Sequence, residues 1–317
     1  MPRVSIRGSP MRRSIGVAML LLVALVAAAA DLVASDLPLF CVLDGQTYVL
    51  PCLTRPAALV GLDQQALAKR ATSFVGTPIP YGPTAQRPGG TLAPLAPPCR
   101  AHLLGTDDRG RDVAARLAHG ARVACVVGPL AVLLYLALGA LVGIACAARR
   151  WLDMLLARII EASLSIPALL LVLAVQGLRG NGSAVQLALV IALAEWPVAA
   201  RLTRAEALRV VASPHVLAAR GLGASAARIA WHHVLPLALG PARALAAFGL
   251  GQAVLFEAAL GVLGFGVAPP TASWGELLAQ ALQHPRWWLV LPPSLSIAAV
   301  VLGARLSVDD DPTASRS

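Results

Sequence analysis

The chain has 317 residues, of which 57% are hydrophobic and 13% are charged, and its formal net charge is +10. Soluble domains carry about 25% charged residues, so this composition, with a mean hydropathy of +0.72, excludes an ordinary soluble enzyme and indicates a protein embedded in lipid. The only lysine is Lys69, which follows Ala68 and precedes Arg70. A phosphate-binding loop of the form G-x-x-x-x-G-K-[ST] is therefore absent, and any nucleotide that drives this chain must bind to a partner.

Six apolar stretches are candidates for membrane-spanning helices, each of which needs about 20 predominantly apolar residues. They cover residues 15–33, 123–148, 162–178, 184–200, 237–263 and 287–302. The first stretch is short, and Glu195 and Pro197 interrupt the fourth. We therefore expect an all-α polytopic membrane protein with about six transmembrane helices.

The arginines give the expected orientation, because short cytoplasmic loops carry an excess of Lys and Arg. Arginines precede the first span, separate the second span from the third, and separate the fourth from the fifth, whereas the alternate short loops hold only Arg179 and Arg286. Both termini are therefore expected in the cytoplasm. A cleaved signal peptide ending near Ala28-Ala29-Ala30 stays open as an alternative for the first span, and its removal would leave the later topology unchanged.

These spans divide the chain into four expected parts. Residues 1–33 form the cytoplasmic N-terminus and first span, 34–122 a periplasmic loop, 123–306 a core of five spans with a cytoplasmic segment at 201–236, and 307–317 a polar tail.

The long loop contains one clear local signal. Asp44-Gly45 favours a tight hairpin over residues 40–49, because both residues tolerate positive φ. A two-residue turn there places Cys41 opposite Tyr48 and leaves Cys52 beyond the paired end, which argues against a bridge between the two cysteines. A disulfide among Cys41, Cys52 and Cys99 nevertheless stays open, because all three fall in the oxidising compartment. Residues 76–98 are rich in Pro and Gly and are expected to form an extended linker.

Residues 213–236 are expected to form a helix, a bend and a second helix. Ser213 and Pro214 suit the start of the first helix, Gly221 and Gly223 suit its end, and Ser225 suits the cap of the second helix, which leads to Pro236. The small residues at the bend would allow a partner surface to approach closely. The alternative is an ordinary basic loop that lies against anionic lipid headgroups.

The spacing in this segment resembles the permease subunits of ATP-binding-cassette importers, in which E-A-A-x-x-x-G is followed after nine residues by I-x-L-P. The matching residues are Leu217, Ala218, Ala219, Gly223, Leu235 and Pro236. Leu217 replaces the family's acidic residue, and His233 stands at the Ile position. The resemblance implies that these six residues couple the chain to an ATPase.

Two further segments resemble the peptide and nickel branch of these permeases. His102 to Val113 is similar to H-x-x-G-T-D-x-x-G-R-D-V, with its matches at Gly105, Thr106, Asp107, Gly110, Arg111 and Asp112. Ala258 to Gly275 is similar to A-L-S-F-L-G-x-G-x-x-P-P-x-x-S-W-G. In the long loop, residues 36–39 and 78–83 resemble the subgroup that takes up oligopeptides and the peptide antibiotic microcin C.

The resemblance implies a type I importer permease fold and import of peptides or a related small solute across the bacterial inner membrane. It further implies a second permease subunit, two ATP-binding subunits and a periplasmic solute-binding protein, with no cofactor, no catalytic or metal-binding residue and no nucleic acid. Closure of the ATPases would push the bend around Gly223 and rock the spans. The alternative is an ion-coupled secondary carrier or a polytopic membrane enzyme that uses Glu195 or Glu257 for proton transfer.

Glu257 is the best candidate within the spans for lining or gating the path. An ionised carboxylate at the centre of a bilayer-spanning helix costs about 2.5 kcal/mol or more, so it should face protein or water. Ser273, Trp274 and Gly275, from the second motif, are grouped with Glu257 as path or gate residues. A structural pair with an arginine or a backbone amide is the alternative for Glu257. Trp274 suits an interfacial anchor as well as it suits a contact for the protein that delivers the solute.

Overall fold

The computed structural model describes residues 10–59, 61–85, 94–180 and 182–308. The chain divides into two compact units: Met1–Val17, Val127–Phe256 and Val301–Ser317 form unit 1, and Ala18–Val126 and Glu257–Val300 form unit 2. The expected polar tail lies outside the described residues except for residues 307 and 308.

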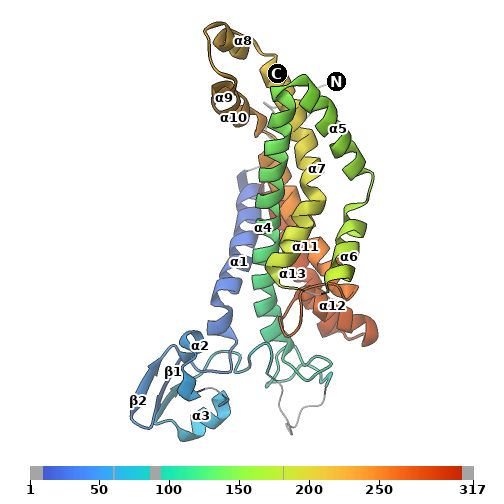
Figure 1. Cartoon of the computed structure of the whole chain (residues 1–317). Helices are drawn as coiled ribbons and strands as arrows, with labels where there is room; N and C mark the ends of the chain where they lie inside the picture. Colours follow the sequence, from blue (N-terminus) through green and yellow to red (C-terminus); the bar gives the residue numbers. More distant parts are fainter. Residues whose placement is uncertain (1–9, 60, 86–93, 181, 309–317) are drawn as a thin grey trace, which may run out of the picture. The chain divides into compact units, whose positions relative to one another are not determined.

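Against the expectation of about six spans, the described residues contain five continuous apolar helices long enough to cross a membrane, or six spans if one bent pair of helices counts as a single span. The continuous helices, labelled in Figure 1, are α1 (Pro10–Val33), α4 (Val113–Ala148), α7 (Ala184–Val211), α11 (Ala242–Val262) and α13 (Trp287–Leu306). The bent pair is α5 (Arg150–Leu164) and α6 (Ala168–Arg179), whose axes differ by 79°. The second span begins at Val113, earlier than the predicted residue 123, and α11 begins at Ala242, later than the predicted residue 237.

The prediction of a continuous third span over 162–178 is wrong. The break falls at Ser165-Ile166-Pro167, where Pro167 precedes the first residue of α6. Proline has no N–H to donate and disfavours helical backbone in the residue before it. The Ser165 hydroxyl donates to the Ala162 carbonyl over 2.7 Å and helps to close the last turn of α5.

The expected interruption of the fourth span is also wrong, because α7 continues through Glu195 and Pro197 to Val211. Close packing within unit 1 holds this helix. Gly139 and Gly143 of α4, spaced four residues apart, approach α7 so closely that an added Cβ would clash with Ala199 and Thr203 respectively. Small residues at this spacing let two helix backbones approach in a membrane.

An ion pair further joins α7 to α5. Arg204 donates to both carboxylate oxygens of Asp153, from Nε over 2.5 Å and from Nη2 over 2.9 Å. This two-bond geometry is the strong form of an Arg–carboxylate pair. The pair lies in the part of α7 that extends beyond the predicted end at residue 200.

The predicted hairpin is confirmed in unit 2. Strands β1 (Phe40–Leu43) and β2 (Gln46–Val49) pair antiparallel with Cys41 opposite Tyr48. Asp44 and Gly45 have φ values of 51° and 76°, as a tight turn requires. A third strand that the sequence did not indicate, β3 (Ser73–Val75), pairs with β1 to give the order β2-β1-β3.

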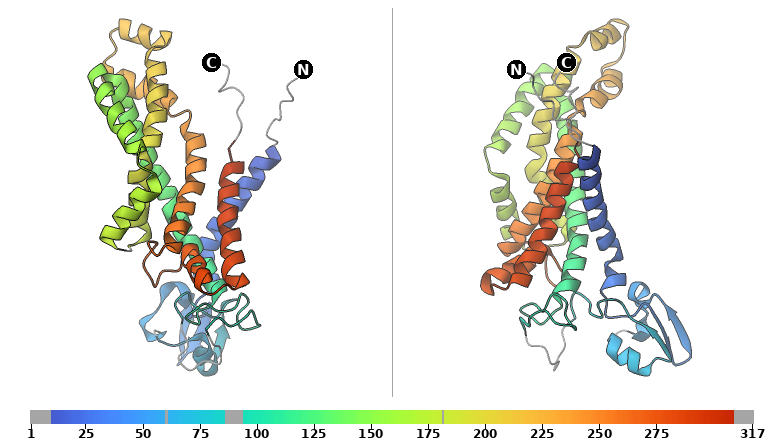
Figure 2. Two further views of the ribbon diagram at one scale, coloured as in Figure 1. Left: turned by 90° about the vertical axis from the view of Figure 1, so that its right-hand side faces the viewer. Right: turned by 180° about the vertical axis from the view of Figure 1, so that it is seen from behind.

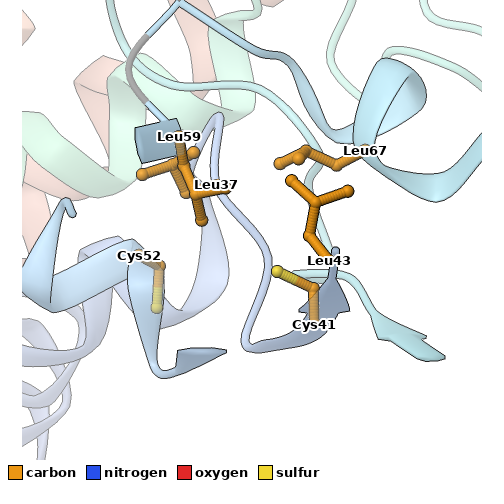
Figure 3. Close-up of a cluster of buried hydrophobic side chains, with 6 residues drawn as sticks. All are labelled: Leu37, Cys41, Leu43, Cys52, Leu59 and Leu67. Carbon is orange, nitrogen blue, oxygen red and sulfur yellow. The ribbon is translucent and has the colours of Figure 1, made fainter. Parts of the chain in front are cut away.

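The hairpin belongs to a small folded subdomain, which is more structure than the sequence indicated. It adds α2 (Pro51–Thr54), η1 (Ala57–Leu59) and α3 (Gln64–Arg70). Its apolar core, shown in Figure 3, consists of Leu37, Cys41, Leu43, Cys52, Leu59 and Leu67. Cys41 and Cys52 are free thiols in this core, and Cys99 is a free thiol on the surface.

Candidate functional site

The bend in the 213–236 segment is built by the residues that the sequence singled out. Helix α8 (Pro214–Gly221) begins after Ser213, and Gly223 has a φ of 85° at the reversal, a conformation that glycine adopts without steric strain. Ser225 accepts a hydrogen bond from the Arg228 backbone N–H over 3.3 Å and so caps α9 (Ala226–Arg228).

Ser213 does not cap with its side chain, contrary to expectation. It occupies the N-cap position of α8, but its hydroxyl donates to the Val210 carbonyl of α7 over 2.5 Å. The bond secures the end of α7 where α8 departs.

The second helix of the segment is irregular. A π-helical turn, η2 (Ile229–Val234), follows α9, and α10 (Leu235–Ala238) then starts with Pro236 in its first turn. Single π-turns of this kind are frequent at functional sites.

One side of this segment packs on the end of α7 and the other is open. The packed core consists of Ala207, Val210, Val216, Ile229, Val234 and Ala238. Of the six residues in the predicted coupling motif, Leu217, Ala218, Gly223 and Pro236 are exposed and Ala219 and Leu235 are half-buried. The segment therefore offers the predicted small residues on a surface that is anchored to a membrane-spanning helix.

Unit 2 contains a second site, where the 102–113 motif forms a buried charge cluster. We define the charge cluster as Asp107, Arg111, Arg116 and Glu276. Arg111 donates from Nε to Asp107 over 2.6 Å and from Nη2 to Glu276 Oε1 over 3.1 Å. Arg116 donates from Nη2 to Glu276 Oε2, and its Nε lies 3.4 Å from Asp107. The two buried guanidiniums are thus paired with Asp107 and Glu276, and Asp108 lies a further 3.7 Å from Arg111 Nη2, which meets the need of a buried charge for a partner.

The remaining residues of this motif shape the backbone around the charge cluster. Asp112 accepts from the Ala115 N–H over 2.7 Å and, through its other oxygen, lies 2.7 Å from His102 Nδ1. Gly105 and Gly110 have φ values of 70° and 74°. Thr106 accepts from the Ala96 N–H over 2.8 Å.

The 258–275 motif packs against the charge cluster through α12 (Trp274–Gln283). Glu276 lies in the first turn of this helix, where its N–H donates to the Ser273 hydroxyl over 3.1 Å. Arg116 and Glu276 were not among the predicted site residues. The spacing Ser273-x-x-Glu276 is a capping-box pattern that indicates a helix start.

Three glycines of this motif bring the backbones into contact. A Cβ on Gly261 would lie 2.7 Å from the Gly275 Cα, and one on Gly266 would lie 2.7 Å from the Gly261 Cα. Real Cβ atoms do not approach so closely, so the glycines set the spacing between α11 and the start of α12.

Trp274 is buried rather than interfacial. It is 2% exposed, and its Nε1 donates to the Leu117 carbonyl over 3.0 Å. The alternative of an interfacial anchor is therefore wrong.

Glu257 lies with two of its predicted companions. It is 1% exposed and interacts with the Ser273 hydroxyl, while its Oε1 atom is buried without a hydrogen-bond partner among the described residues. Gly275 contacts Ala258, the next residue of α11. Of the two alternatives for Glu257, a pair with an arginine is not present among the described residues, where it interacts with the Ser273 hydroxyl; the pair with a backbone amide stays open.

The described residues include no group of three or more His, Cys, Asp or Glu side chains that could hold a metal ion. The candidate functional sites are two: the 213–236 bend in unit 1, and the charge cluster with Glu257 in unit 2. With the apolar spans, they define a multi-pass membrane protein that presents an anchored, partner-accessible bend, which is the class of transport permeases.

Comparison with known proteins gives the family. Residues 139–309 match the family described as "Binding-protein-dependent transport system inner membrane component", and the chain belongs to this family. It is 38% identical over 219 residues to the dipeptide transport system permease protein DppC of Alkalihalophilus pseudofirmus, covering 68% of this chain and 71% of that one. It is also 38% identical over 258 residues to the dipeptide transport system permease protein DppC of Escherichia coli K12, covering 80% and 86% of the two chains.

Among solved structures, an inward-facing form of the MetNI methionine ABC transporter aligns with a TM-score of 0.48 and 18% identity, over 61% of this chain and 94% of that one. The family assignment confirms the predicted all-α polytopic permease fold and makes the chain the permease subunit of an ABC importer, with ATP-binding and substrate-binding partners. The family is one of transport permeases, so it favours the permease over the alternative of an ion-coupled carrier.

Proposed function

We propose that this chain imports peptides across the bacterial inner membrane as one of two different permease subunits, above two ATP-binding subunits and beneath a periplasmic solute-binding protein. The dipeptide permeases to which it is similar support the cargo. The distribution of arginines supports a topology in which both termini and the 213–236 segment are cytoplasmic. The hairpin subdomain and the charge cluster then lie on the periplasmic side.

The single observation that carries the coupling role is the anchored bend. Val216 and Ile229 are buried against Ala207 and Val210 of α7, so a displacement of the bend moves the end of a membrane-spanning helix. The motif residues Leu217, Ala218, Ala219, Gly223, Leu235 and Pro236 form the surface that receives the partner. ATP-driven closure of the partner then shifts the permease between outward-open and inward-open states, because the partner binds the two states with different affinity.

Glu257, Ser273, Trp274 and Gly275 act at the path or gate in this proposal. The surroundings of Glu257 support this role. Its Oε1 atom has no hydrogen-bond partner among the described residues, so the carboxylate can form a new hydrogen bond when α11 moves relative to α12. Trp274 has a positioning role at the gate, because its hydrogen bond to the Leu117 carbonyl holds the start of α12 against α4. The motif residues Gly105, Thr106, Asp107, Gly110, Arg111 and Asp112 hold the charge cluster that fixes α12 at this gate.

The test substitutes Gly223→Trp in the full transporter, reconstituted with its binding protein, and measures peptide-stimulated ATP hydrolysis. No atom lies within 4 Å of a Cβ built on Gly223, so the indole would occupy the space of a docked partner. A side chain at a φ of 85° also strains the backbone, so the melting temperature of each variant is measured alongside. Gly223→Asn is the matched control, because Asn tolerates the left-handed backbone and adds little bulk. We expect stimulation to fall at least about tenfold for Trp and much less for Asn. Undiminished stimulation in the Trp variant would overturn the coupling role.

A further inference from the structure

Glu195 is a carboxylate inside a membrane span, and the proposed function gives it no role. It lies about 16 Å along α7 from the first residue of the helix, at 1.5 Å per residue, and so well inside a hydrocarbon core of about 30 Å. Its side chain is half-buried and forms no hydrogen bond or ion pair with any residue that the structure describes. Ionisable residues within spans are costly and mark the paths of substrates or ions.

The carboxylate lies on the face of α7 that packs inside unit 1. Residues four apart share one face of a helix, and both neighbours at this spacing, Ile191 and Ala199, are buried. The exposed leucines of the same stretch, Leu189 and Leu193, lie about 120° and 160° away around the helix. A second protein chain that covered these leucines would therefore not reach Glu195.

Helices α4 and α11 accompany α7 on this inner face, as the views in Figures 1 and 2 show. Tyr135 of α4 is close enough to Glu195 for an electrostatic interaction. Its hydroxyl, however, donates to the Leu245 carbonyl of α11 over 3.1 Å, and an added Cβ on Gly249 would overlap that hydroxyl. The phenol is thus held in place with its proton already used, and it leaves the carboxylate without a donor.

The surroundings suit an ammonium group better than a metal ion. The described residues offer no group of three His, Cys, Asp or Glu side chains, whereas Ca²⁺ needs six to eight oxygen ligands. Tyr135 and Trp196 instead belong to one packed cluster beside Glu195. Aromatic rings attract ammonium groups through their faces, so the carboxylate and the rings favour the same kind of cation.

We infer that Glu195 binds the N-terminal ammonium group of the peptide as the peptide crosses the membrane. This inference rests on the proposed function and adds a binding site for the cargo within the span. Every peptide with a free N-terminus carries this group whatever its side chains are, so one carboxylate serves peptides of different sequence. A single ion pair also forms and breaks readily, and a transport path requires sites that release what they bind.

The test uses the complete transporter, purified in detergent without added lipid and without its solute-binding protein, so that neither lipid ammonium groups nor the binding protein contributes. Equilibrium dialysis measures the binding of radiolabelled Ala-Ala and of N-acetyl-Ala-Ala, which lacks the ammonium charge, to the wild type and to Glu195→Gln. Glu206→Gln is the matched control, because it removes a carboxylate from the same helix where that carboxylate pairs with Arg209. Uptake of Ala-Ala into proteoliposomes that contain the binding protein is measured in parallel.

We expect Glu195→Gln to weaken the binding of Ala-Ala at least about tenfold, since a hydrogen bond to a charged group is lost. Binding of N-acetyl-Ala-Ala should stay within about twofold, because a variant and a ligand that remove the same contact do not add their effects. Glu206→Gln should leave both affinities unchanged, and Glu195→Asp, which keeps the charge, should bind Ala-Ala more tightly than Glu195→Gln does. Uptake of Ala-Ala should fall with its binding.

The melting temperature separates this role from a structural one. Glu195→Gln removes an unpaired charge from a span, so the Tm should stay the same or rise. A lowered Tm that the additional substitution Arg243→Gln restores would overturn the inference and assign Glu195 to an ion pair within the chain.

Three results on the ligands would also overturn the inference. They are equal weakening of Ala-Ala and N-acetyl-Ala-Ala by Glu195→Gln, unchanged binding of Ala-Ala by this variant, and no detectable binding of Ala-Ala to the wild type up to about 10 mM. If the wild type takes up Ala-Ala and Glu195→Gln takes it up equally fast, the proposed function stands and only this inference fails. A wild type that takes up no peptide would contradict the proposed function itself.

Discussion

Trp274 donates a hydrogen bond from its indole Nε1 to the main-chain carbonyl of Leu117 over 3.0 Å. The bond joins the first residue of α12 to the second turn of α4, two elements that lie far apart in the sequence. An added Cβ on Gly120, one turn further along α4, would lie 2.7 Å from the Trp274 ring. The two sequence motifs of unit 2 therefore form one packed structure, and the predictions below test what holds it together.

Removing the charge of Glu276 should destabilise unit 2. Glu276→Gln leaves Arg116 with Asp107 alone and Arg111 with Asp107 and the more distant Asp108, and the two guanidinium groups are almost fully buried. Breaking a buried pair from one side costs about 3 kcal/mol or more, because a charge stays buried without compensation. Thermal unfolding in detergent should show a clearly lowered Tm.

Glu206→Gln is the matched control for this prediction. Its partner Arg209 is well exposed to solvent, and exposed pairs contribute at most about 1 kcal/mol. Equal shifts of Tm in the two variants would contradict the prediction that the buried charge cluster contributes more to stability than an exposed ion pair does.

The contact between Gly261 and Gly275 should tolerate no added methyl group. Gly261→Ala would force the backbones of α11 and α12 apart, and overpacking of this kind costs about 1–3 kcal/mol. Gly221→Ala is the control, because nothing lies within 4 Å of a Cβ at that position. The melting temperatures of the two variants should separate, and a Gly261→Ala variant as stable as Gly221→Ala would show that the contact is not tight.

The hairpin and the approximate positions of the spans could be predicted because their causes are local. Asp44-Gly45 fixes the turn, and the turn fixes the pairing of Cys41 with Tyr48. A run of about 20 apolar residues needs no partner to identify it.

Two prolines show why the helix limits could not be predicted. Pro167 and Pro197 both interrupt apolar runs, yet only Pro167 breaks its span. Pro197 is buried within α7, whose Ala199 contacts Gly139 of α4, whereas Pro167 is exposed. Packing from a distant helix thus compensates for the lost hydrogen bond at one proline and not at the other.

The charge cluster escaped prediction for a related reason. Arg116 and Glu276 are 160 residues apart, and no local pattern links them. Arg116 fell in the segment assigned to the long loop, although α4 already begins at Val113. The capping pattern at Ser273 and Glu276 gave the only local sign that a helix starts there.

The pair between Arg204 and Asp153 should show measurable coupling. Both side chains are about three-quarters buried and share two hydrogen bonds. A double-mutant cycle with Arg204→Ala and Asp153→Ala, read as free energies of unfolding, should give an interaction energy of about 1 kcal/mol. The Arg158–Glu161 pair, which is largely exposed, is the control and should give about 0.3 kcal/mol or less. A coupling energy at Arg204 as small as the control would mean that α5 is held against α7 without this pair.

The buried thiols of the hairpin subdomain should make its stability fall in alkaline solution. Burial raises the pKa of both Cys41 and Cys52 above the ordinary value of 9.0. The unfolded state therefore loses its thiol protons at a lower pH than the folded state, so stability is full below about pH 9 and declines as the pH rises toward the folded pKa values. Alkylation rates measured from pH 7 to 10 on single-cysteine variants should be low for Cys41 and Cys52 and should rise steeply above pH 9. The exposed Cys99 provides the control and should react quickly throughout. Equally rapid alkylation of Cys41 at pH 7 would show that its side chain is not held in the apolar core of Figure 3.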